Sequence, residues 1–177
     1  MKIKKLDHIE NIVLPSINGE NFDTSRLKGK KYLLTFYRFA SCPMCSLRIN
    51  EMINRYDELG DDFAVVGIFH SEISNLKRFM KRHDSPFIIM ADKDFKYFSK
   101  YDVQRSFIRF MSTFILRAPR FLRAAFKLYI SPTIKGHIDI MPIDILVDEK
   151  GKVQDVKYGK DIGDHISIEE IIKFSHS

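Results

Sequence analysis

The sequence predicts an α/β fold with a central mixed sheet, and three observations lead to this class. Residues 32–37 and 63–69 are apolar without alternation, as strands buried on both faces are. Segments with helical spacing separate these runs from each other and from a third run, 87–90. Strands that alternate with helices predict parallel pairing with right-handed crossovers. Near the C-terminal end, 143–147 and 153–158 flank a turn, which predicts an antiparallel hairpin.

The remaining elements follow from local signals. Residues 11–30 are expected to form an entry loop or hairpin, with Asn18-Gly19 as its turn. The helix after residue 42 should close at Gly60, Ser71 can cap the next helix, and 92–101 should form a short one. Ser167 and Glu170 make a capping box for a final helix over 168–174.

Length and composition predict one globular domain over residues 1–177. The chain is 45% hydrophobic and 29% charged, which is ordinary for a globular protein, and no apolar run reaches transmembrane length. The first ten residues are basic without a following apolar segment, so a secretory signal is not expected. Two cysteines without such a signal predict the cytosol, where a cysteine pair would cycle between thiols and a disulfide.

The positive charge is concentrated in one segment. The net charge of the chain is +6, yet residues 103–138 contain no acid. Residues 104–130 are predicted to be an insertion of two helices, broken at 118–119, which packs its phenylalanines inward or into a partner and shows its arginines outward. The cations of the segment are Arg105, Arg109, Arg117, Arg120, Arg123, Lys127 and Lys135.

The two cysteines of the chain, Cys42 and Cys45, lie at the predicted junction of a strand and a helix. If Cys42 is the N-cap, Cys45 is the third helical residue, and their Cα atoms lie roughly 5–6 Å apart, within reach of a disulfide. Free N–H groups of the first turn favour a thiolate at the N-cap. Pro43 suits the first helical position. We therefore expect Cys42 to be the exposed nucleophile of low pKa and Cys45 the more buried resolving thiol.

Three alternative roles for the cysteine pair stay open. The cysteines could be small buried hydrophobic residues. They could be half of a zinc site, although the sequence has no second C-x-x-C and no histidine pair at ligand spacing. They could form a static disulfide, although so short a loop constrains the unfolded chain little.

The motif Phe36-Tyr37-Arg38-Phe39-Ala40-Ser41-Cys42-Pro43-Met44-Cys45 resembles the F-Y-R-x-x-x-C-P-x-C signature of the peroxiredoxin-like branch of the alkyl hydroperoxide reductase/thiol-specific antioxidant superfamily. Met141-Pro142, directly before the hairpin, resembles the cis-proline site of that fold. The resemblance implies a thioredoxin-like fold, with Cys42 as the attacking sulfur and Cys45 as the resolving sulfur. It also implies that a cis Pro142 faces the pair and that the Met141 backbone pairs with a bound peptide or reductant.

The sequence also departs from the family pattern. Ser41 stands where thioredoxins have tryptophan, and Phe36 stands where they have a buried acid. The peroxiredoxin pattern P-x-x-x-T-x-x-C is absent, since Thr35 and Phe39 occupy its proline and threonine positions. These departures favour dithiol–disulfide exchange over peroxidase activity. Arg38 could stabilise the Cys42 thiolate or be a solvated charge at a strand end.

Two hypotheses of function follow. The first is a thiol–disulfide oxidoreductase or thiol-dependent peroxidase. It would need no metal or cofactor beyond a Cys42–Cys45 disulfide. Its partners would be a thiol reductant, a disulfide client or a hydroperoxide. Its partner-binding residues would be Arg38, Ser41, Met141 and Pro142. The second is a binding module whose basic helices dock an anionic membrane or an acidic partner, with the thiols as sensor or relic. No nucleic-acid motif accompanies the charge, so nucleic acid is not expected as a partner.

Overall fold

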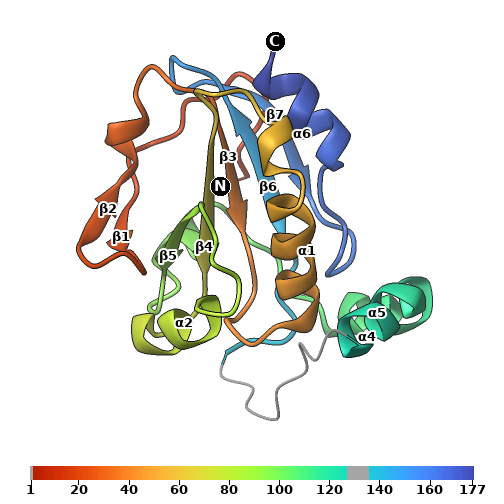
Figure 1. Cartoon of the computed structure of the whole chain (residues 1–177). Helices are drawn as coiled ribbons and strands as arrows, with labels where there is room; N and C mark the ends of the chain where they lie inside the picture. Colours follow the sequence, from red (N-terminus) through yellow and green to blue (C-terminus); the bar gives the residue numbers. More distant parts are fainter. Residues whose placement is uncertain (1, 127–135) are drawn as a thin grey trace.

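The computed structural model describes residues 2–126 and 136–177, and its core is a five-stranded sheet flanked by helices (Figure 1). The strands are β1 Val13–Pro15, β2 Asn21–Asp23, β3 Tyr32–Phe36, β4 Ala64–Phe69, β5 Ile88–Ala91, β6 Ile143–Val147 and β7 Val153–Tyr158. The α-helices are α1 Pro43–Ile53, α2 Ile73–Met80, α3 Lys96–Lys100, α4 Phe107–Leu116, α5 Ala118–Phe126 and α6 Ile168–Ser175. Short 3-10 helices lie at Thr24–Leu27 and Tyr56–Glu58.

The sheet has the order β5-β4-β3-β6-β7 and is mixed, as predicted. Strands β3, β4 and β5 are parallel, whereas β6 runs antiparallel to both β3 and β7. β3 is buried along its whole length because it lies in the middle of the sheet, which explains its unbroken apolar run. β1 and β2 form the predicted entry hairpin outside this sheet.

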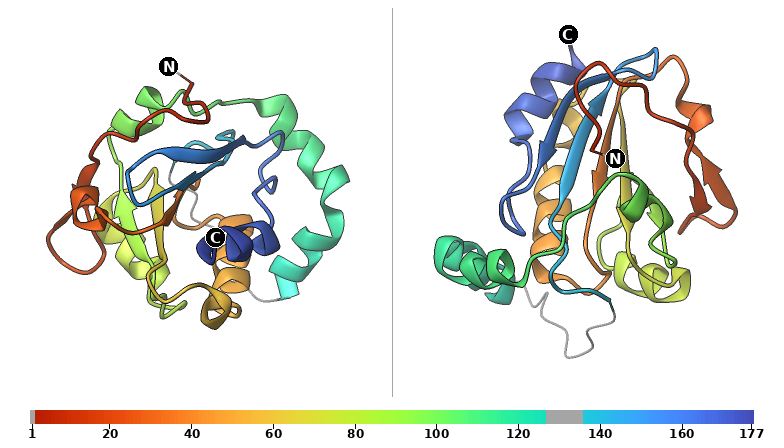
Figure 2. Two further views of the ribbon diagram at one scale, coloured as in Figure 1. Left: turned by 90° about the horizontal axis from the view of Figure 1, so that it is seen from above. Right: turned by 180° about the vertical axis from the view of Figure 1, so that it is seen from behind.

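Two apolar clusters cover the two faces of the sheet. Leu33 and Tyr37 of the β3 segment pack with α1, α2 and α6 on one face. Leu34 and Phe36 pack with α3 and the N-terminal segment on the other face. Figure 2 shows α1 and α6 together on one side of the strands. Both cysteines belong to the first cluster, so the dithiol lies at the edge of the main core.

The basic insertion forms the predicted pair of helices, α4 and α5, beside α1 and outside the sheet (Figures 1 and 2). The prediction that its arginines point outward is wrong in part, and its phenylalanines are divided between the core and the solvent-exposed side. Phe110 and Phe121 pack against the core, but Phe107, Phe114 and Phe126 are exposed. Meanwhile arginines point back to the body: Arg105 pairs with Asp139, Arg117 with Asp161, and Arg120 and Arg123 with Glu51. Acids elsewhere in the chain therefore attract these guanidinium groups inward.

Other predicted boundaries shift slightly. α1 ends at Ile53, before a 3-10 turn, and does not reach Gly60. The N-cap of α2 is Glu72 and not Ser71, whose hydroxyl interacts with Glu72 and Asn75. The capping box of α6 is formed as predicted. Within the described residues, no helix has the length and apolar character needed to cross a membrane. Lys127 and Lys135 lie outside the described residues.

A dithiol site at the start of helix α1

The Cys42 sulfur caps the first turn of α1. Cys42 has an extended backbone and is the N-cap, Pro43 takes the first helical position, and Cys45 is the third helical residue, as predicted. The backbone N–H of Cys45 donates to Cys42 Sγ at 3.2 Å. The chain reaches this helix from β3, which pairs with β4 and β6 in the middle of the sheet. The start of α1 is therefore anchored to the core of the sheet.

Arg38 supplies a positive charge to the same sulfur. Its Nη1 lies 3.5 Å from Cys42 Sγ, and its Nη2 donates to the Ile138 carbonyl at 2.6 Å. The guanidinium carbon lies 5.1 Å from the ring centre of Phe39 and 5.3 Å from that of Phe110. Arg38 is buried, so its charge is poorly screened. The solvated strand-end alternative is therefore wrong, because Arg38 is fixed against Cys42.

The surroundings shift the pKa values of the two thiols in opposite directions. Burial raises the pKa of Cys42, but hydrogen bonding from Cys45, the charge of Arg38 and the N–H groups of the first turn outweigh burial and lower that pKa to about 6. Burial raises the pKa of Cys45 well above its usual value, and the neighbouring Cys42 raises it further. At neutral pH the arrangement favours a thiolate on Cys42 and a thiol on Cys45.

Both sulfurs are buried, which corrects the expectation that Cys42 is exposed. Cys42 is 0% exposed and Cys45 3% exposed, and both are free thiols. Both cysteines pack in the apolar cluster on this face of the sheet, and Arg38, fixed by Phe110 of α4 and by the Ile138 carbonyl, lies against the Cys42 sulfur. Ser41 is also buried in the turn before α1.

Residues 136–141 pack over this end of the sheet. Gly136 has a φ of +128°, and a Cβ there would lie 2.9 Å from Phe39 Cβ, so both the backbone and the space require glycine. The ring of His137 stacks on that of His70, with ring centres 4.9 Å apart. The backbone N–H of His70 donates to the Arg38 carbonyl. This segment thus joins the start of β6 to the residues around Cys42.

The expectations for Met141 and Pro142 need correction. The peptide bond between them is trans, since the described residues contain no cis bond. The Met141 N–H donates to the Gln104 carbonyl at 2.8 Å, and the Pro142 carbonyl accepts from Gly159 at 2.9 Å. Neighbours within the chain therefore hold this extended stretch, and trans is the default form of a prolyl bond. The Met141 N–H, expected to pair with a bound peptide, is already used by the segment that leads into α4.

A buried acid that sequence reasoning missed lies on β6. Asp144 pairs in register with Thr35 of β3, accepts the Thr35 hydroxyl at 2.6 Å, and lies 3.0 Å from His165 Nδ1. The Ile166 N–H also donates to Asp144, and Arg48 of α1 donates to the Ile166 carbonyl. Burial raises the pKa of Asp144, but the charge and hydrogen bond of His165, the charge of Arg48 and the Thr35 hydroxyl lower it to about 2.

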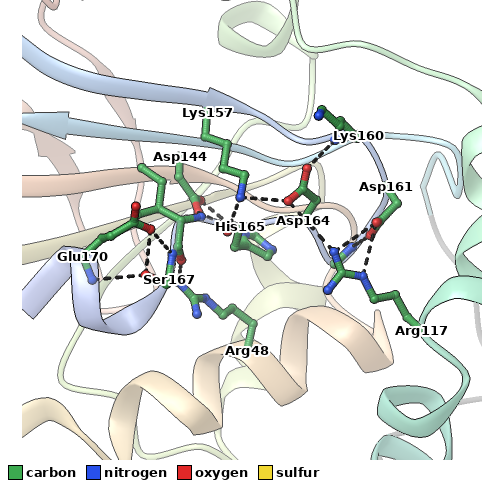
Figure 3. A network of polar contacts seen from close by, with 12 residues as sticks. Arg48, Arg117, Asp144, Lys157, Lys160, Asp161, Asp164, His165, Ser167 and Glu170 are labelled. Carbon is green, nitrogen blue, oxygen red and sulfur yellow. Dashed lines mark hydrogen bonds and ion pairs between the residues drawn. The ribbon is translucent and has the colours of Figure 1, made fainter.

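Figure 3 shows that this network reaches the insertion. Lys157 bridges the His165 carbonyl and Asp164, and Arg117 of the insertion pairs with Asp161 in the same loop. The loop after β7 is thereby tied to β6, α1 and the insertion at once. The signal for this network in the sequence is Asp144 itself, a single acid inside an otherwise apolar strand.

The described residues contain no cluster of three or more histidine, cysteine or acidic side chains able to hold a metal ion. Within that part of the chain, the arrangement therefore gives no support to the half-zinc alternative. What the site holds is a buried dithiol with one acidified sulfur and an adjacent guanidinium.

A family model described as the AhpC/TSA family matches residues 6–156. Among curated proteins, the chain is 31% identical over 96 residues to the thiol-disulfide oxidoreductase ResA of Bacillus subtilis, covering 52% of this chain and 52% of that relative. It is 23% identical over 94 residues to peroxiredoxin Bcp of the same species, covering 52% of this chain and 60% of that relative. The matches thus span only about half the length of these relatives.

Solved structures agree on the fold. The crystal structure of peroxidoxin BcpB from Mycobacterium tuberculosis superposes with a TM-score of 0.71 at 16% identity, covering 98% of this chain and 97% of that one. A thiol:disulfide interchange protein of the thioredoxin family from Chlorobium tepidum gives a TM-score of 0.55 at 21% identity, covering 100% and 99%. The predicted thioredoxin-like fold is confirmed.

Proposed function

The chain belongs to the AhpC/TSA family, and on that basis we propose that it is a dithiol–disulfide oxidoreductase with Cys42 as nucleophile and Cys45 as resolving thiol. The observation that carries the proposal is that two donors contact the same sulfur. Cys42 Sγ accepts a hydrogen bond from the Cys45 backbone N–H at 3.2 Å and lies 3.5 Å from Arg38 Nη1. Both contacts favour the thiolate, the form that attacks a disulfide.

The reaction needs only these two sulfurs. The Cys42 thiolate attacks one sulfur of a client disulfide, a new S–S bond forms, and the other client sulfur leaves as a thiolate with the bonding electron pair. Cys45 then gives up its proton to water and attacks Cys42 Sγ, which expels the second client sulfur. The client gains two electrons, and the protein is left with the Cys42–Cys45 disulfide. A thiol reductant restores the dithiol by the reverse exchange.

A small hydroperoxide is the second candidate oxidant, and two observations favour it. Cys42 is fully buried, so a small molecule reaches it with less rearrangement than a protein disulfide does. Arg38 Nε has no hydrogen-bond partner among the described residues, which leaves a donor for a peroxide oxygen on the guanidinium group that contacts the Cys42 sulfur. Here Cys42 attacks one peroxide oxygen, an alcohol or water leaves, and Cys45 converts the resulting sulfenic acid to the disulfide with release of water.

Quenched-flow oxidation of the reduced protein tests both candidates. A small linear disulfide and hydrogen peroxide are compared as oxidants, with loss of two hydrogens read by mass spectrometry, because the chain has no tryptophan for fluorescence. We expect a Cys42–Cys45 disulfide from the model disulfide at neutral pH. A faster reaction with hydrogen peroxide, through a sulfenic acid trapped in Cys45→Ser, would assign the peroxidase function instead. A dithiol inert to both oxidants contradicts the proposal.

A further inference from the structure

The insertion presents an apolar face to solvent. Ile108 is 82% exposed, Ile115 is 83% exposed and Phe126 is 86% exposed. These side chains lie on two consecutive helices joined at Arg117, which project beside α1 (Figure 1). We call this the insertion face, and its exposed apolar residues are Phe107, Ile108, Met111, Phe114, Ile115, Leu116, Leu122 and Phe126. So many large exposed apolar side chains on neighbouring turns mark an interaction surface.

The opposite side of the insertion fixes its orientation. Phe110 and Phe121 pack on the core, and Thr113 and Ala124 are buried. Arg117 donates to Asp161, and Arg120 donates to Glu51 at 2.6 Å. Because these contacts hold the polar and aromatic side against the body, the insertion face cannot turn inward without breaking them.

Charge selects among the possible occupants of the insertion face. Residues 103–138 contain no acid, but Arg105, Arg117 and Arg120 pair with acids of the body, so Arg109 and Arg123 are left as the main exposed cations of the described part of the insertion. Arg109 is exposed and donates to Gln104, and Arg123 keeps 58% of its side chain exposed beside Glu51. A second copy of the chain would bring like charges together at such a face, whereas an anionic surface is complementary to it.

We propose that the insertion face docks on the surface of an anionic lipid bilayer, with α4 and α5 lying in the plane of the interface. Short amphipathic helices with aromatic and aliphatic residues on one side and arginines at the boundary bind membranes in this way. The apolar side chains enter the boundary between head groups and acyl chains, and the guanidinium groups of Arg109 and Arg123 contact lipid phosphates. This inference is independent of the redox chemistry, since no cysteine belongs to the insertion face.

Vesicle flotation tests the proposal, with phosphatidylcholine vesicles prepared with and without phosphatidylglycerol at about 0.01 M and about 0.15 M ionic strength. The wild type should float with the phosphatidylglycerol vesicles, more at low salt. Ile108→Glu and Ile115→Glu should each weaken binding about tenfold, because a charge replaces a buried apolar side chain. Arg109→Gln should weaken it about fivefold. Leu6→Glu, at an exposed leucine elsewhere, is the matched control and should bind like the wild type.

Three results would overturn the proposal. The first is no flotation with anionic vesicles at low salt. The second is flotation that Ile108→Glu and Ile115→Glu leave unchanged. The third is self-association that these variants abolish, seen by sedimentation equilibrium without lipid binding, which would assign the face to a second copy. Cys42→Ser should bind vesicles like the wild type, so a failure of the redox proposal is distinguishable from a failure of this one.

Discussion

Cys42 is acidic because several favourable contacts outweigh its burial. Burial opposes the thiolate, while hydrogen bonding from Cys45, the Arg38 charge and the N–H groups of the first turn favour it. Arg38 acts well because Phe39, Phe110 and the Ile138 carbonyl hold its guanidinium in place. Elements far apart in the sequence therefore set the acidity of one sulfur.

The first prediction concerns the pH dependence of Cys42 alkylation. The rate of reaction with iodoacetamide should rise with pH and reach half its maximum near pH 6, because the pKa of Cys42 is about 6. Arg38→Met should raise this midpoint by about 1 unit, since it removes the adjacent positive charge. Arg78→Met is the matched control, because Arg78 lies over Phe79 on α2 instead. Peptide mapping that finds Cys45 alkylated first would reverse the assignment.

The second prediction concerns Asp144. The folded pKa of this carboxylate is about 2, below its ordinary 3.8, so its stabilising effect is fully present above pH 3.8 and is lost as pH falls through about 2. Asp144→Asn should lower the free energy of unfolding by about 2 kcal/mol at neutral pH. The difference in free energy of unfolding between variant and wild type, measured by urea unfolding, should decrease as the pH is lowered from 4 to about 2.

Asp155→Asn is the matched control for this experiment. Asp155 lies on the neighbouring strand β7 and is exposed, so its replacement should change stability by less than about 0.5 kcal/mol. An Asp144→Asn variant as stable as the control would show that the carboxylate does not hold the network around His165.

At the scale of elements, the sheet was predictable because its strands are buried. Runs of apolar residues defined β3, β4 and β5, and the helix caps at Cys42 and Ser167 followed from side-chain chemistry. The packing of the insertion was not predictable. Whether Arg117 and Arg120 face solvent depends on Asp161 and Glu51, which come from distant parts of the chain. For the same reason, the use of the Met141 N–H by Gln104 could not be read from local sequence.

The third prediction concerns residues 104–106, which pair with residues 139–141 before β6. The backbone N–H of Ser106 donates to the Asp139 carbonyl, and the backbone N–H of Met141 donates to the Gln104 carbonyl. The Arg105 side chain donates to the Asp139 carboxylate at 3.1 Å. Arg105→Gln should loosen this pairing and raise the rate of reduction of a peptide disulfide by roughly 2–5-fold, with no change toward hydrogen peroxide. Quenched-flow rates with both oxidants check this.

The control for Arg105→Gln removes a comparable surface ion pair elsewhere. Lys93→Gln breaks the contact of Lys93 with Glu72, at 2.8 Å, and should leave both rates unchanged. Equal acceleration with both oxidants, or none with either, would mean that the segment does not limit access to Cys42.

At the scale of the molecule, the cysteine pair itself was the part of the site most visible in the sequence. The spacing of Cys42 and Cys45 at a helix start placed one sulfur over free N–H groups, and the structure has that geometry. The burial of Cys42 was not visible, because it depends on tertiary packing in the apolar cluster and on Arg38, which α4 and the residues before β6 hold in place. The site is assembled by the sheet, α1 and the insertion together, so the proposed reaction of the dithiol requires that this enclosure opens or admits a small oxidant.

Trapping of a mixed disulfide shows which of the two sulfurs attacks. The single variants Cys45→Ser and Cys42→Ser are each incubated at neutral pH with a small disulfide, and the adducts are located by intact-mass measurement and peptide mapping. We expect a stable adduct on Cys42 in Cys45→Ser and little adduct on Cys45 in Cys42→Ser, because only Cys42 is a thiolate at this pH. Adduct formation on Cys45 at an equal or higher rate would show that Cys42 is not the nucleophile.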